Sequence, residues 1–379
     1  MPNLFDYLEW RGDLTFGQDP FHTIDALILA QLSYIPFDGI VPESFAESVS
    51  LLEAAEHFDP SVVPETTRSF SYEQDCLLLK KLSESARFRE LRLSGYVSRT
   101  EPKDAVQFAA VTVRLPQNVC FLSYRGTDGS IAGWKEDFNF SFMSETPGQR
   151  DAAAYLMRCC ASTDAEIWTG GHSKGGNFAV YAAVFNAPEI RKRVTRVYDF
   201  DSPGFRDEIA ELEPFQEAKP KILSVIPQSS LIGQLLTSAT EHRIVTSRAA
   251  ALGQHLAYAW EIRGTDFVYA DELSKLGMFI NRTVNGWLST LDDSGRQSLT
   301  AAVFDVIQAS EKENFYEIRA EKLKSARAIL SALRRLSPEQ RELVKQAIAK
   351  LAAQSKEALF PERKKPQRKP KTKKESSPD

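Results

Sequence analysis

The stretch that decides the fold is Gly170-Gly171-His172-Ser173-Lys174-Gly175-Gly176. It contains the pattern G-x-S-x-G between a predicted strand, 166–169, and a predicted helix through 178–183. A serine at such a strand-to-helix turn takes a strained backbone conformation, and glycines beside it remove the clash that a Cβ would cause. The turn then presents the Ser173 hydroxyl above the sheet edge as a nucleophile. A glycine-rich turn without chemistry is the alternative.

Outward from this turn, strands and helices alternate. A hairpin turn at 116–118 joins the first two predicted strands, and a helix is predicted at 150–160. Strands alternating with helices predict a mainly parallel sheet that is covered on both faces. The other predicted strands are 108–115, 119–124, 194–200, 221–226, 243–246, 258–262 and 267–269.

Both ends of the chain have a helical pattern. Residues 1–100 show apolar stripes at 24–32, 44–58 and 72–82, which predicts a helical segment packed on a core of residues 101–270. The pattern predicts a helical extension over residues 271–361, strongest at 313–336 and 338–359. Ser337 followed by Pro338 is typical of a helix start. We expect the extension to be structural.

Composition bounds the class of protein. Of 379 residues, 42% are hydrophobic and 26% charged, which excludes a wholly disordered or fibrous chain. No apolar run approaches the roughly 18 residues of a membrane span, and no signal segment begins the chain. The four cysteines have no CxxC spacing. We therefore expect a cytoplasmic protein with reduced thiols, no cofactor and no metal.

Residues 362–379 differ from the rest of the chain. They hold eight Lys/Arg and three acidic residues, a net charge of +5, whereas the body carries −9. We expect this tail to be disordered. It would attract an anionic partner, nucleic acid or a membrane surface, by counterion release. A merely solubilising tail is the alternative.

A serine nucleophile needs a base, and five histidines are available: His22, His57, His172, His242 and His255. In hydrolases with this turn the chain order is serine, acid, histidine, which excludes His22 and His57. His172 is expected to be a packing residue. His242 begins a strand, the wrong end of a parallel sheet, whereas His255 lies in a loop before a strand. We favour His255 as the base.

Two backbone amides are candidates for an oxyanion hole. The amide of Lys174 lies at the helix N-terminus, directly after the nucleophile. The second donor would come from a loop after an earlier strand, and the loop 125–129 follows the strand that ends at Tyr124. We assign Thr127 as that donor. A simple connecting loop is the alternative.

These motifs carry a resemblance. The segment SYRGT at 123–127 paired with GHSKGG at 171–176 resembles the fungal-type triacylglycerol lipases of the α/β-hydrolase superfamily, and WKED at 134–137 is similar to their Trp/Asp pattern. Over about residues 3–270 the chain more closely resembles a bacterial Mbeg-like family of α/β-hydrolase relatives. The resemblance implies an α/β-hydrolase fold and a Ser/His site, but no substrate. Its pieces are FDYLEWRGD at 5–13, LSYI at 32–35, GHSKGGN at 171–177, SPGF at 202–205, IPQSS at 226–230 and QH at 254–255.

The chain departs from the lipase pattern at two places. Where the lipases have leucine after the nucleophile it has Lys174, whose side chain we expect to be solvated. Where they place an acid after the strand 221–226, it reads Pro-Gln-Ser-Ser. The nearest carboxylate is Asp201, at the end of the preceding strand, and we choose it as the acid. If Gln228 or Ser229 orients His255 instead, the enzyme would be slow or inactive.

Two functions follow. The first is a serine hydrolase, esterase- or lipase-like, acting on a small-molecule or lipid ester through Ser173, His255 and Asp201. Leucine and isoleucine at 231, 232, 235 and 236 would then wall an acyl pocket or, as the alternative, belong to the core. The second is an inactive hydrolase-fold scaffold that binds through its helical extension and basic tail. The sequence does not determine the oligomeric state.

Overall fold

The computed structural model describes residues 1–101, 106–238 and 240–308, and single positions from 331 to 350. In this part of the chain, nine strands form one sheet in the order β1-β2-β3-β4-β5-β6-β7-β8-β11. The strands from β4 to β8 run parallel, and the strands at both edges are antiparallel. The strands are β1 (Val49–Ser50), β2 (Arg92–Glu101), β3 (Val106–Leu115), β4 (Val119–Tyr124), β5 (Glu166–His172), β6 (Val194–Phe200), β7 (Ile222–Pro227), β8 (His242–Val245) and β11 (Tyr269–Ala270).

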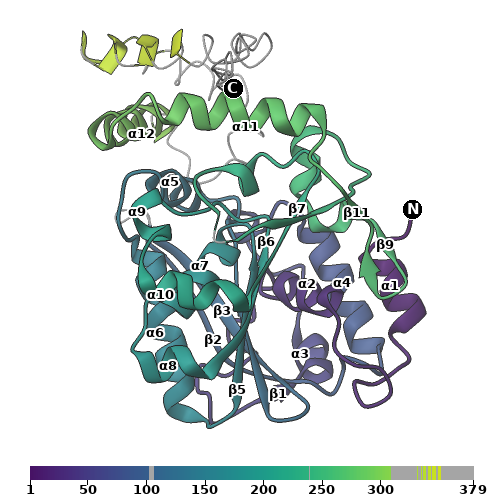
Figure 1. Ribbon diagram of the computed structural model, residues 1–379. Helices are drawn as coiled ribbons and strands as arrows, with labels where there is room; N and C mark the ends of the chain where they lie inside the picture. The colour runs from purple at the N-terminus through teal and green to yellow at the C-terminus, as the bar shows by residue number, and fades with distance from the viewer. Residues whose placement is uncertain are drawn as a thin grey trace, which may run out of the picture.

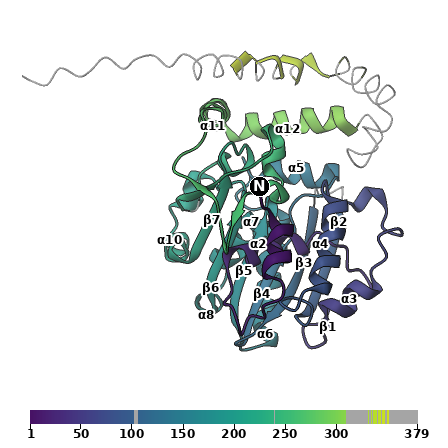
Figure 2. The same ribbon diagram turned by 90° about the vertical axis from the view of Figure 1, so that its right-hand side faces the viewer.

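Helices cover both faces of the sheet (Figure 1). Each face buries its own apolar cluster. One face carries α1 (Leu4–Arg11), α2 (Thr23–Leu32), α3 (Leu51–His57) and α4 (Tyr72–Glu84), and the other carries α6 (Pro147–Ser162), α7 (Lys174–Val184), α8 (Pro188–Arg193), α9 (Asp207–Ala210) and α10 (Glu213–Ala218). Three more helices, α5 (Ile131–Asn139), α11 (Lys275–Leu288) and α12 (Asp293–Gln308), lie beyond the carboxyl ends of the parallel strands (Figures 1 and 2). This arrangement is an α/β-hydrolase fold.

The N-terminal hundred residues are not wholly helical, and that expectation is wrong at two strands. The helices expected at 24–32 and 72–82 are confirmed as α2 and α4, but the one expected at 44–58 begins only at Leu51, after β1. β2 pairs with β3, and its register shifts where Gly95 has φ +64°. This irregularity interrupts the alternation of inward and outward side chains from which a strand is predicted.

Most of the expected core elements are confirmed, including the strands β3, β4, β6, β7 and β8 and the helix α6. The strand expected at 258–262 is wrong. Residues Ala257–Ala259 form a 3-10 turn, and only Ile262–Arg263 form a strand, β9, which pairs with β10 (Asp266–Phe267). Tyr258 and Trp260 are buried in the core, so their apolar character reflects packing rather than strand pairing.

In the C-terminal extension, α11 and α12 form as the helical pattern predicts. Ser337 caps a helix start as expected, because its hydroxyl accepts from the Gln340 amide at 3.1 Å and the Gln340 side chain accepts from the Ser337 amide. Most of 313–336 and 338–359, and all of the tail 362–379, lie outside the described residues. No helix in the described residues is long and apolar enough to cross a membrane.

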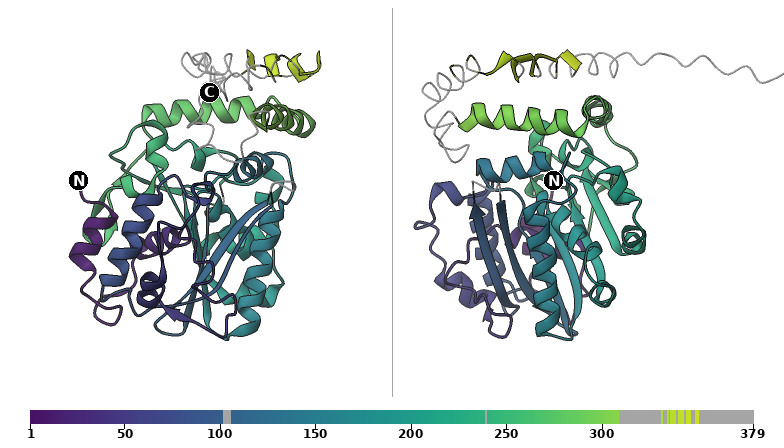
Figure 3. Two further views of the ribbon diagram at one scale, coloured as in Figure 1. Left: turned by 180° about the vertical axis from the view of Figure 1, so that it is seen from behind. Right: turned by 90° about the vertical axis from the view of Figure 1, so that its left-hand side faces the viewer.

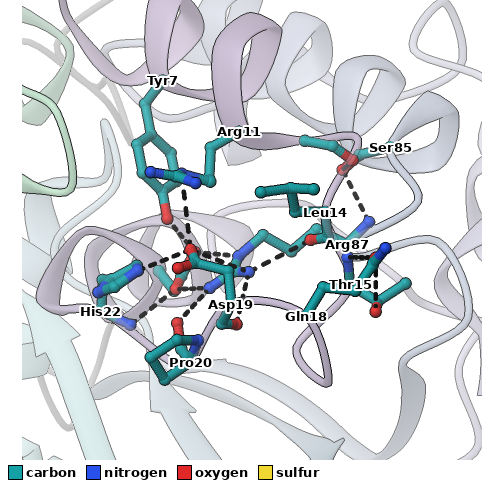
Figure 4. A network of polar contacts seen from close by, with 12 residues as sticks. Tyr7, Arg11, Leu14, Thr15, Gln18, Asp19, Pro20, His22, Ser85 and Arg87 are labelled. Atoms are coloured by element: carbon teal, nitrogen blue, oxygen red, sulfur yellow. Dashed lines mark hydrogen bonds and ion pairs between the residues drawn. The ribbon is translucent and has the colours of Figure 1, made fainter.

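A buried ion pair fastens α2 to the loop after α4, within the polar network around Arg87 (Figure 4). The Arg87 guanidinium contacts both carboxylate oxygens of Asp25, at 2.9 and 2.6 Å, and neither side chain reaches solvent. Tyr7 of α1 donates its hydroxyl to the same carboxylate at 2.9 Å. The network fixes the start of α2, and the residues that follow the other end of this helix reach the candidate site.

Tyr7→Phe removes only the hydroxyl from this network. Because the hydrogen bond goes to a charged, buried carboxylate, we expect a loss of about 1.5–3 kcal/mol in the free energy of unfolding. Urea unfolding measures it. Trp10→Phe, on the exposed side of the same helix, is the control and should change stability little. Equal stability of Tyr7→Phe and the wild type would contradict the role of this hydroxyl.

Candidate active site

Ser173 lies at a tight turn between β5 and α7. Its backbone has φ +58° and ψ −137°, and its amide donates to the Phe200 carbonyl at 2.8 Å, which ties the turn to β6. The glycines allow the close approach that this turn needs. A Cβ at Gly175 would lie 2.1 Å from the carbonyl oxygen of Tyr124, the last residue of β4. The sequence therefore places the hydroxyl at the carboxyl edge of the sheet.

The structure brings Ser173, His255 and Asp201 into one hydrogen-bonded chain. Nε2 of His255 lies 2.9 Å from the Ser173 hydroxyl oxygen, and Nδ1 lies 2.7 Å from Oδ2 of Asp201. Asp201 is completely buried, whereas the His255 side chain is 23% exposed. The arrangement has the geometry of a nucleophile, a base and a carboxylate that orients the base.

Asp201 follows β6 directly, with φ +51° and its amide bonded to the Val225 carbonyl of β7. Its second oxygen, Oδ1, accepts from the Ser230 hydroxyl and from the Gly233 amide at 3.1 Å. The segment after β7, which has no carboxylate of its own, thus holds the Asp201 carboxylate in place. Ser229 donates its amide to the Gln254 side chain instead. A carboxylate therefore lies behind the His255 imidazole, although none follows β7.

His172 does more than pack. Burial lowers its pKa well below 6.5, so the ring is neutral. Its Nε2 lies 2.7 Å from the backbone oxygen of His255 and donates to it, which leaves Nδ1 to accept from the Tyr34 hydroxyl at 3.2 Å. Tyr34 follows α2, so the N-terminal segment reaches the base through His172. His242, at the start of β8, bonds to Ser224 and not to Ser173.

Both candidate oxyanion donors belong to segments that pass close to Ser173. Lys174 opens α7, so its amide has no acceptor within the helix. A Cβ at Gly126 would lie 3.0 Å from the Ser173 Cβ, which shows how closely the loop before Thr127 passes the serine. The Thr127 hydroxyl donates to Asp137 at 2.6 Å. The roles of the two amides stay predictions.

The expectation of a solvated Lys174 side chain is wrong. The side chain is fully buried, and its ammonium lies 3.0 Å from a carboxylate oxygen of Glu136, which is buried as well. The other oxygen of Glu136 accepts from the Gly148 amide at 2.8 Å. The lysine therefore points into the protein and pairs there with a residue of α5. It is not available to bind an anionic substrate.

A cavity of about 380 Å³ opens onto Ser173 and His255. Its polar lining residues include Gln31, Tyr34 and Asp75. The rest of its wall is mainly apolar. The aliphatic residues of the 231–236 stripe belong to this wall, as the acyl-pocket interpretation predicted. The apolar lining residues are Phe70, Trp134, Phe138, Pro203, Leu231, Ile232, Leu235, Leu236, Leu256, Ala257, Val284, Trp287, Leu288, Leu291 and Leu299.

Comparison with known proteins shows the family of this chain. A model of the Mbeg1-like family matches residues 82–305, more than half of the chain. The chain belongs to the Mbeg1-like family. No curated protein matches it. Among solved structures, a mutant form of MDLA from Penicillium cyclopium matches at 14% identity and a TM-score of 0.39, over 65% of this chain and 83% of that one. The M37 lipase matches at 14% identity and a TM-score of 0.35, over 56% and 69%.

Sequence reasoning missed Tyr34 and Glu136 as contributors to the site of this Mbeg1-like protein. Tyr34 lies in the LSYI piece and Glu136 in the WKED piece, both quoted for the resemblance without a role. The one signal that could have indicated them was their position in a motif shared with the family. Their contacts with His172 and Lys174 depend on chain packing across 138 and 38 residues.

Asp75 gives the site a pH-dependent feature. Burial raises its pKa from 3.8 to about 7, although the hydroxyls of Ser69 and Tyr258 donate to it. Between about pH 4 and 7 the folded state therefore keeps a proton that the unfolded chain has released. This contribution to stability is complete below pH 4 and is lost as pH rises to 7, by at most about 1.4 kcal/mol per pH unit.

Asp75→Asn removes this titration. We expect the free energy of unfolding of the variant, relative to the wild type, to rise between pH 4.5 and 7 and to stay level above pH 7.5. Urea unfolding at four pH values measures the difference. A difference that is independent of pH would show that Asp75 titrates normally in the folded protein.

Proposed function

We propose that this protein is a serine hydrolase that cleaves an acyl ester, with Ser173 as nucleophile, His255 as base and Asp201 as the orienting acid. The observation that supports it best is the hydrogen-bonded chain from Asp201 through His255 to Ser173, at the mouth of an apolar cavity. A merely structural serine does not need an imidazole, and an imidazole on a buried carboxylate is the arrangement that deprotonates a hydroxyl.

In the proposed mechanism the Ser173 oxygen attacks the ester carbonyl while Nε2 of His255 takes its proton. The amides of Lys174 and Thr127 donate to the oxyanion of the tetrahedral intermediate. His255 then returns the proton to the leaving alcohol. Water repeats the sequence on the acyl-enzyme with His255 again as base, and Asp201 holds the imidazole in the tautomer that both steps require.

Two further observations support the substrate and the compartment. The cavity wall beside Ser173 is mainly apolar, which suits the acyl part of an ester. The four cysteines, Cys76, Cys120, Cys159 and Cys160, are free thiols, as in proteins of a reducing cytoplasm. We propose a cytoplasmic esterase.

Labelling with a fluorophosphonate probe tests the proposal. The wild type should react and Ser173→Ala should not. Ser141→Ala is the matched control, because this serine lines the same cavity but donates to the Phe138 carbonyl, and it should label like the wild type. An unlabelled wild type, or equal labelling of Ser173→Ala, would reject the assignment.

A further inference from the structure

The helices of the C-terminal extension supply part of the cavity wall. Val284, Trp287 and Leu288 from α11, and Leu291 and Leu299 from the following loop and α12, line the space that opens onto Ser173. Figures 1 and 3 show α11 lying across the end of the molecule that the carboxyl ends of the strands reach. Without these helices, the stripe at 231–236 would lose the apolar surface that faces it.

The extension is fastened to the body at both ends of this wall. Before α11, the Ser274 amide donates to the Gln228 carbonyl at 2.8 Å, and within it the Asn285 side chain donates to the Gln234 carbonyl at 2.7 Å. These two acceptors flank the segment that holds Asp201. The wall and the acid are therefore tied to the same loop.

The start of α12 is held as firmly. Arg206 pairs with Asp293 at 2.7 Å, and the Arg296 guanidinium donates to the Ser141 carbonyl at 2.6 Å. Further along, the ring of Phe304 packs edge-on against Phe138 of α5 at 5.5 Å. Contacts with the loops after β6 and β7 and with α5 make the two helices part of the site. They are more than the structural extension expected from the sequence.

We propose that α11 and α12 form the distal wall of an acyl-binding cavity, and that this wall selects esters of one medium-length acyl chain. The proposal rests on the proposed hydrolase function. A cavity of 380 Å³ holds about a dozen groups of the size of water or methylene, at about 30 Å³ each. After the carboxyl group is counted, the chain that fills it has about eight to ten carbons.

Binding of saturated fatty acids to Ser173→Ala tests the wall without any reaction. Isothermal titration calorimetry with acids of four to sixteen carbons, each below its micellar concentration, gives one dissociation constant per length. We expect it to fall about fourfold per added methylene until the cavity is full, at about ten carbons, and then to level off.

The break is the chain length at which the dissociation constant stops falling. Substitutions in the wall should change that length. Leu299→Trp fills the distal end, so the break should shift by two to four carbons toward shorter acids, whereas Trp287→Ala should shift it toward longer ones. Ser298→Trp, exposed on the neighbouring position of α12, is the matched control and should leave the break in place. Circular dichroism and thermal unfolding show whether each variant folds, and the two wall variants move the break in opposite directions.

The outcomes separate the two proposals. A break that Leu299→Trp and Trp287→Ala both leave unchanged, or the absence of fatty-acid binding, would overturn the acyl wall even if the fluorophosphonate probe labels Ser173. A break that moves as expected in a protein whose Ser173 never labels would keep the wall and reject the hydrolase.

Discussion

Asp201→Asn is expected to lower kcat for ester hydrolysis by about 10⁴, the effect of removing the orienting carboxylate from a serine triad. Asp201 accepts from Nδ1 of His255 at 2.7 Å, which leaves Nε2 free to accept the Ser173 proton. An asparagine amide can donate to Nδ1 and so favour the tautomer that carries its proton on Nε2. Because Nε2 then carries a proton, the imidazole cannot accept the proton of Ser173. Hydrolysis of a p-nitrophenyl ester, followed at saturating substrate, measures the loss.

Asp199→Asn is the matched control for this result. Asp199 lies two residues earlier, on β6, is buried to a similar degree, and accepts from Ser224 rather than from His255. We expect its kcat to stay within about tenfold of the wild type. If both variants lose activity equally, the loss reflects damage to β6, and Asp201 has no special role.

Lys174→Leu is expected to cost about 3–5 kcal/mol of the free energy of unfolding, because it leaves the Glu136 carboxylate buried without its cation. Both side chains are completely inaccessible, so solvent cannot compensate. The backbone amide of residue 174 is retained, and the proposed oxyanion donor with it. Urea unfolding measures the cost, and the folded fraction should still react with the fluorophosphonate probe.

The double variant Lys174→Leu, Glu136→Gln should recover most of this loss. With the charge removed from both partners, neither is left unpaired, so the two single costs are strongly non-additive. Simple addition of the two costs would mean that the ion pair contributes nothing as a pair. The Gly148 amide donates a hydrogen bond to Glu136 in the wild type, and the oxygen of the glutamine side chain can still accept it.

The sequence was most informative where structure is local. Glycines 171, 175 and 176 around Ser173 permit one kind of turn, and the apolar strand before it and helix after it are short-range patterns, so the position of the hydroxyl could be predicted. The same holds for the core strands β3 to β8. β1 and β2 were missed because a two-residue strand has no pattern and Gly95 breaks the register of the longer one.

The order of residues and strands along the chain reduced the number of candidate partners for Ser173. It did not predict which hydrogen bonds those partners make. The sequence favours His255 as the base because it follows the serine in a loop near the sheet edge. It favours Asp201 as the acid because it ends a neighbouring strand. Their hydrogen bonds depend on the side-by-side pairing of β6 and β7, which brings Ser230 and Gly233 behind the carboxylate.

The sequence by itself determined the turn that carries Ser173 and the alternation that builds the sheet, because both depend on residues adjacent in the chain. Only the tertiary structure decided that Lys174 is buried against Glu136, that His172 holds the backbone of His255, and that α11 and α12 wall the cavity. Each of these contacts joins residues tens of positions apart. Such contacts form only when whole elements pack, and no local pattern records which elements will meet.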